Sequence, residues 1–205
     1  YDPPFEIHVH GEVSLHPEVT TDDVAEALRP LWQYAGARSL AEGAASAYDE
    51  EPGIQYDQRQ NLLRMCWTVR GDEAFRRSID DMCMNLNELA STGAPIEVTF
   101  YDTEYDDEDS ESRGEAARDD FMIVFVGQTP AAIMQIQRDL LVQDVIAVIE
   151  RHFDSSELRG VVEEVDKLFT QRFDALVESL ELGKPPSGSG PAGHRGNGRN
   201  KRHLH

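Results

Sequence analysis

The sequence predicts an α/β protein of the α+β layout: a ferredoxin-like β-α-β-β-α-β sandwich, followed by an extra strand and a C-terminal two-helix hairpin. Three observations support this prediction. Residues 1–101 show strand and helix patterns in the order strand, helix, two strands, helix, strand. An apolar stretch, FMIVFVG, fills residues 121–127. Two long helical patterns then run from Thr129 to Gly183.

The first strand is expected at residues 5–15, where apolar and polar residues alternate. One face carries Phe5, Ile7 and Val9, and the other carries Glu6, His8 and His10. A helix follows Pro17, with Thr20 or Thr21 as its N-terminal cap. Pro30 is expected to kink this helix or to end it early.

The next elements follow from alternation and helical spacing. Residues 53–71 predict a β-hairpin with its turn near residues 58–61, because apolar residues alternate with polar ones after the turn. A second helix begins after Asp72, and a strand covers residues 95–102. Residues 37–52 have no clean period and are expected to hold a short strand or a long loop.

The chain divides into four parts. Residues 1–101 form the ferredoxin-like α/β unit, and residues 102–120 form an acidic mobile loop. Residues 121–183 supply a strand and two long helices that pack on the same domain, and residues 184–205 form a disordered basic tail. The strand at 121–127 is expected to join the same sheet and to be buried on both faces.

The composition of the chain limits the classes of partner and the setting that are expected. The formal net charge is -20, which repels nucleic acid and anionic membranes, so direct DNA binding by the body is not expected. No apolar run approaches the roughly 20 residues that cross a bilayer. The two cysteines, Cys66 and Cys83, form no C-x-x-C motif, which favours a reduced, cytoplasmic setting.

The motif His8-Val-His10 is the strongest candidate for chemistry. Residues two positions apart on a strand point to the same face, so two imidazoles can reach one metal ion. A third ligand is needed, and the candidates are His16, Glu6, Glu12 and Asp57. The alternative is that both histidines are polar side chains on an ordinary sheet face, under a loop or helix. No nucleophile or nucleotide motif accompanies them, so we assign no catalytic residue and no cofactor.

Several stretches carry a resemblance to known sequences: PFEIHVHGEV, EEPGIQYD, MCWTV and FVGQTPAAIMQIQRDLLVQDV. They resemble an uncharacterised protein family of unknown function found in phages and proteobacteria. The similarity spans most of residues 3–185. The resemblance implies a small, phage-encoded or bacterial cytoplasmic protein, and it implies no catalytic residue.

Three functions are compatible with these observations. The first is a non-enzymatic acidic binding protein that engages a host or phage protein, in its sharpest form a DNA-mimicking inhibitor of a basic, nucleic-acid-binding protein. The second is a metal-dependent hydrolase that uses His8 and His10. The third is an assembly protein that forms a homodimer through the C-terminal helices.

Overall fold

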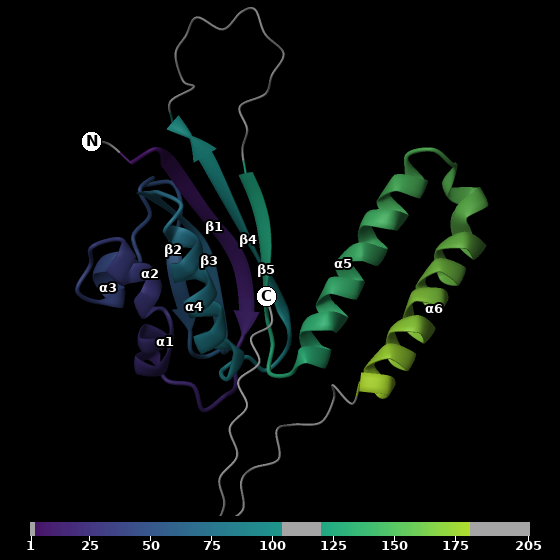
Figure 1. Cartoon of the computed structure of the whole chain (residues 1–205), viewed down its shortest axis with the longest axis horizontal. Helices are drawn as coiled ribbons and strands as arrows, with labels where there is room; N and C mark the ends of the chain where they lie inside the picture. Colours follow the sequence, from purple (N-terminus) through teal and green to yellow (C-terminus); the bar gives the residue numbers. More distant parts are fainter. Residues whose placement is uncertain (1–2, 104–119, 181–205) are drawn as a thin grey trace, which may run out of the picture.

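A five-stranded antiparallel sheet forms the centre of this computed structural model, which describes residues 3–103 and 120–180 (Figure 1). The expected acidic loop, apart from its ends, and the expected basic tail lie outside the described residues. The sheet order is β2-β3-β1-β4-β5. The strands are β1 (Phe5–Ser14), β2 (Gly53–Asp57), β3 (Leu62–Gly71), β4 (Ala94–Asp102) and β5 (Asp120–Val126).

The first strand occupies the middle of the sheet, as expected. It pairs with β3 on one side and with β4 on the other, both antiparallel. Its apolar residues Ile7 and Val9 are fully buried, whereas His10 on the opposite face is exposed. The alternation in the sequence therefore predicted correctly which side of β1 faces the core.

One face of the sheet is covered by helices (Figure 1). They are α1 (Thr21–Ala27), α2 (Arg29–Tyr34), α3 (Leu40–Gly43) and α4 (Phe75–Asn87). Thr20 caps α1 in a capping box, and the predicted break near Pro30 is real, because α1 and α2 meet at Leu28. Trp67, Phe75 and Phe100 are the largest fully buried side chains of the core between sheet and helices.

Two expectations need correction. Residues 37–52 hold the short helix α3 and then an irregular segment, and no strand is found there. Strand β5 joins the sheet as expected, but it is an edge strand and is not buried on both faces, because Phe121 and Ile123 are exposed. The apolar residues of β5 that do face the core are Met122, Val124 and Val126.

Two long helices follow the sheet: α5 (Pro130–Glu150) and α6 (Ser155–Leu180). They lie side by side, and together they stand beside the β5 edge (Figure 1). We call them the α5–α6 pair. Near its start, α5 packs closely on the sheet connections, because Ile136 would be 2.7 Å from a Cβ atom added at Gly93. No described helix, α5 and α6 included, is both long enough and apolar enough to span a membrane.

The position of the pair answers a question that the sequence left open. The two helices could cover the second sheet face or remain free for another chain. Contacts between α5 and the sheet fall on β4 and β5, and His10 on β1 is exposed. The α5–α6 pair therefore does not cover the two histidines, and the face that bears them is open at His10, whereas Thr68 beside His8 is buried under the irregular segment.

Candidate functional site

The open face of the sheet gathers the side chains that the sequence placed on the polar side of β1. His8 pairs with Thr68 on β3, and His10 pairs with Cys66 on the same strand. On the other side of β1, His10 lies opposite Glu97 of β4. Since paired residues of antiparallel strands point to the same face, Cys66 belongs with the two histidines.

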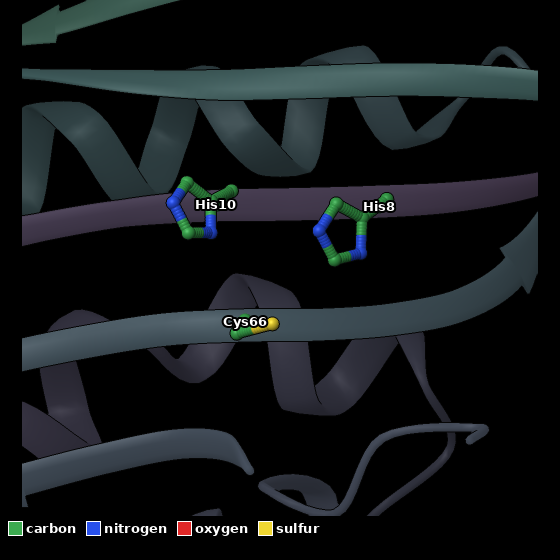
Figure 2. A group of neighbouring side chains, drawn as sticks. All are labelled: His8, His10 and Cys66. Carbon is green, nitrogen blue, oxygen red and sulfur yellow. The ribbon is translucent and has the colours of Figure 1, made fainter. Parts of the chain in front are cut away.

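These three residues lie close enough to hold one ion. A nitrogen of His8, a nitrogen of His10 and the sulfur of Cys66 all lie within 4.8 Å of one another. The two imidazole rings are stacked, with centroids 6.2 Å apart and planes at 17°. Figure 2 shows the rings side by side on β1, with the sulfur of Cys66 beside them on the neighbouring strand. The two histidines of H-x-H thus lie together on one face of β1, and Cys66 supplies a third candidate donor beside them.

His8 is held by a short hydrogen-bond chain. Its Nδ1 atom lies 2.9 Å from Oγ1 of Thr68 and 3.4 Å from a carboxylate oxygen of Glu51. The Thr68 hydroxyl is itself 2.9 Å from the Glu51 carboxylate. A carboxylate only accepts, so Thr68 donates to Glu51 and accepts from Nδ1–H of His8. This order places the imidazole proton on Nδ1 and leaves the lone pair on Nε2.

The irregular segment 44–52 brings Glu51 to this place. It runs along the part of β3 that extends beyond β2, where Ala47 N donates to Thr68 O at 2.9 Å and Thr68 N donates to Ser46 Oγ at 2.8 Å. The Ser46 hydroxyl also donates to Glu51, at 3.1 Å. The segment thus replaces a strand at the edge of β3 and presents a carboxylate to the open face.

The thiol of Cys66 is the third candidate ligand. Partial burial raises the pKa of Cys66 above its usual value, and the negative charge of Glu51 adds to the effect. The thiol is therefore protonated at neutral pH, and a metal ion would have to displace its proton.

The third ligands that the sequence suggested are engaged elsewhere. Glu6 accepts a hydrogen bond from Tyr48 and pairs with Arg70, and Glu12 pairs with Arg64. His16 contacts Gln128, and Asp57 accepts from the backbone of the β2–β3 turn. None of the four belongs to the cluster of His8, His10 and Cys66. The sequence contained a sign of Cys66, because it alternates with buried Met65 and Trp67 on β3.

Apolar side chains extend the open face beyond the histidines. Phe121 and Ile123 of β5 pair with Thr99 and Glu97 of β4, so they point to the same side as His8 and His10. Both are exposed, as is Tyr101 on β4.

The α5–α6 pair is the second candidate surface. Only Val142 is buried in α5, and Leu158 is the buried apolar residue among the described side chains of α6. Large apolar side chains stay exposed on both helices: Leu141 (50%), Val148 (54%), Val161 (44%), Leu168 (53%) and Leu176 (44%). We call these five residues the exposed stripes. A hollow of about 410 Å³ on α6 runs past two of them, Val161 and Leu168.

Comparison with known proteins gives one match. The model of a family of unknown function, DUF6806, matches residues 5–170, a range that contains the histidine and cysteine cluster and most of the α5–α6 pair. No curated protein and no solved structure matches the chain.

Proposed function

The chain belongs to the family of unknown function DUF6806, and because that membership assigns no activity, we propose a function from the geometry. The protein is a non-enzymatic binding protein that works as a homodimer, joined through the α5–α6 pair of each copy. The observation that carries the proposal is the set of exposed stripes, Leu141 and Val148 on α5 and Val161, Leu168 and Leu176 on α6.

The composition of α5 supports the proposal that another chain packs on the apolar surface of this helix. Its sequence, PAAIMQIQRDLLVQDVIAVIE, is apolar on most sides, whereas a surface helix of a globular protein is apolar on one stripe. A helix that is apolar all round is normally buried. In this chain α5 contacts β4, β5 and α6, and Leu141 and Val148 remain exposed. The helix therefore has more apolar surface than one copy of the chain covers.

The spacing of the stripes supports a helical partner. Leu141 and Val148 are one heptad apart on α5, and Val161 and Leu168 are one heptad apart on α6. Side chains one heptad apart form the seam of packed helices. Each of the two helices packs on its neighbour and shows a further apolar row on its exposed side. A second copy of the pair would supply two helices to cover these rows, which gives a four-helix bundle. A two-fold axis makes the same patch face itself, so no other protein is required.

Sedimentation of the full chain tests the dimer. We expect the natural chain to sediment as a dimer and the double variant Val148→Glu, Leu168→Glu to sediment as a monomer with unchanged helix content. Met84→Glu is the matched control, because Met84 is 69% exposed on α4, away from the pair, and should leave the dimer intact. A natural chain that stays monomeric at high concentration would rule the dimer out.

The dimer also has an expected salt dependence. The α6 hollow is flanked by Glu157 and Glu164, and the chain as a whole carries a net charge of -20. Two such copies repel each other, and salt screens the repulsion. Added salt should therefore strengthen the dimer, whereas it would weaken attraction to a basic partner.

The acidic surface favours a second candidate function. A protein with this net charge can bind a basic, nucleic-acid-binding protein in place of DNA, which is the DNA-mimic form of the binding hypothesis. The test is whether duplex DNA competes for such a partner and whether binding falls steeply as salt rises. Binding that ignores both DNA and salt contradicts this role.

We also propose that the first part of the chain is ferredoxin-like. The order β2-β3-β1-β4, with neighbouring strands antiparallel and helices on one face, supports this assignment, and β5 then adds an edge strand. The boundaries between the four parts, the cytoplasmic setting, the phage or proteobacterial origin and the metal-dependent hydrolase stay predictions.

A further inference from the structure

We propose that His8, His10 and Cys66 form a Zn²⁺ site on the open face of the sheet, with a fourth coordination position open to solvent. This proposal goes beyond the binding function and is independent of the dimer. The sequence pointed to the two histidines alone, and the pairing of β1 with β3 adds the sulfur.

The three donors suit this ion in kind. Zinc is held in proteins by thiolate, imidazole and carboxylate groups, and a catalytic zinc ion has three such protein ligands with a fourth position open to water or substrate. Hard ions such as Mg²⁺ and Ca²⁺ prefer oxygen ligands, which this cluster does not offer. The residue types therefore select a borderline or soft metal over the hard ones.

The distances also fit, with a small adjustment. Two ligands of a tetrahedral zinc ion lie about 3.3 to 3.8 Å apart, from the usual Zn–N and Zn–S bond lengths. The candidate atoms already lie within 4.8 Å of one another. Closing the remaining gap of about 1 Å takes only small side-chain rotations, since each of the three residues sits on a strand of the same sheet.

A second observation, independent of the distances, points to the same role. Histidines that bind metals generally donate their other ring N–H to a carboxylate or a similar acceptor, which fixes the ring and the tautomer. His8 has this support already, through Thr68 and Glu51. Its Nδ1 is occupied by the chain of hydrogen bonds, so Nε2 is the nitrogen free to bind an ion.

The exposure of the cluster decides what kind of site it is. His10 is exposed, and the α5–α6 pair does not cover it, so water can reach the fourth position. A closed structural site would have four protein ligands. The metal-dependent hydrolase predicted from the sequence would also require an open position. Metal binding therefore has to be demonstrated before hydrolase activity is tested.

Cobalt titration tests the site, because Co²⁺ substitutes for Zn²⁺ and a Co²⁺–thiolate bond gives a charge-transfer absorption in the near ultraviolet. The titration uses the full chain with the tail histidines His194, His203 and His205 replaced by alanine, which removes competing imidazoles. We expect one Co²⁺ per chain with a thiolate band, and displacement of Co²⁺ by Zn²⁺.

Three variants identify the ligands. Cys66→Ser should abolish the thiolate band, and both Cys66→Ser and His10→Ala should weaken Zn²⁺ binding at least tenfold in competition with a chromophoric chelator. Cys83→Ser is the control, because Cys83 is buried on α4 among the core residues and should leave the band unchanged. Circular dichroism confirms that each variant is folded. A chain that binds Co²⁺ without a thiolate band, or a folded Cys66→Ser variant with undiminished Zn²⁺ affinity, would overturn the proposal.

Discussion

The Nδ1 atom of His8 lies 2.9 Å from the hydroxyl oxygen of Thr68, which is its partner across the β1–β3 ladder. Thr68 is the one buried polar side chain among the described residues, and its hydroxyl donates a hydrogen bond to Glu51. Strand pairing thus connects the first histidine of the H-x-H motif to a carboxylate from the distant segment 44–52. Orientation of His8 depends on this connection.

Replacing Thr68 with valine should cost both stability and metal affinity. Thr68→Val keeps the shape but removes the hydroxyl between His8 and Glu51, so two polar groups lose a partner. We expect a loss of about 1 to 2 kcal/mol in the free energy of unfolding and about a tenfold weaker Zn²⁺ affinity. Urea denaturation and chelator competition measure the two effects.

Thr99→Val is the matched control for this prediction. Thr99 pairs with His8 from β4, and its hydroxyl makes no hydrogen bond to any described residue. The control should change neither quantity appreciably. Equal effects of the two substitutions would mean that the Thr68 hydroxyl does not position His8.

The approach of segment 44–52 to β2 depends on a glycine. Gly53 has φ of 78°, and a Cβ atom there would lie 2.1 Å from the carbonyl oxygen of Ala44. That oxygen accepts a hydrogen bond from Ile54 N at 2.9 Å, so it is not free to move. Gly53→Ala should therefore lower the free energy of unfolding by about 3 kcal/mol or more, which exceeds the strain of positive φ alone.

Gly36→Ala separates the two contributions. Gly36 has nearly the same φ, 77°, but an added Cβ there meets no atom within 4 Å. We expect this variant to lose only about 1 kcal/mol, from backbone strain. Chemical denaturation of the two variants side by side measures the difference, and similar losses would contradict a clash at Gly53.

The sequence predicted much of the sheet but not the complete cluster. Alternation placed Cys66 on the polar side of β3 and both histidines on the polar side of β1. Which residue stands opposite which depends on the register, and a shift of one residue would turn every side chain to the other face. The match of His10 with Cys66 is set by the whole β1–β3 ladder, which no local pattern contains.

The conformation of segment 44–52 could not be predicted for a related reason. It has no periodic pattern because tertiary contacts hold it: the Trp67 indole donates to Ala45 O at 3.2 Å, and Thr68 N donates to Ser46 Oγ at 2.8 Å. The prediction that strand β5 is buried on both faces was wrong for a different reason. Its apolar residues on both sides predicted a layer on each face, and this chain alone supplies only one of them.

Cys83 should make the protein sensitive to alkali. Burial raises the pKa of its thiol from 9.0 to about 12, and the nearby charge of Asp80 contributes. The folded state then keeps a proton that the unfolded state releases, so this contribution is complete below about pH 9 and is lost as pH rises toward 12. The free energy of unfolding should fall by up to about 1.4 kcal/mol per pH unit in that window.

Cys83→Ala should flatten this dependence. The variant loses some stability at every pH because it leaves a small cavity, so the informative quantity is the slope of unfolding free energy against pH between about 9 and 11. Denaturation of the natural chain and the variant at several pH values gives both slopes. Identical slopes would show that Cys83 does not titrate with folding.

Arg138 should control how firmly α6 stays on α5. Its guanidinium reaches Asp166 on α6 at 2.9 Å and also contacts Thr170, while it pairs with Asp139 on its own helix. These contacts raise the pKa of Arg138, chiefly through its hydrogen bond to Asp139. Arg138→Met keeps the aliphatic stem but removes the polar connection between the helices. Hydrogen exchange should then show protection in α6 lower by roughly 5- to 30-fold, the equivalent of about 1 to 2 kcal/mol.

The sheet provides the internal reference for this last experiment. Strands β1 and β3 do not depend on Arg138, so their protection should not change. Arg151→Met is the matched control, because Arg151 is exposed at the C-terminal end of α5 and lies away from Asp166. If protection in α6 is unaltered in Arg138→Met, apolar packing alone holds the two helices together. If protection falls in the sheet as well, the pair and the sheet unfold as one unit, and the α5–α6 pair is not a separable interface.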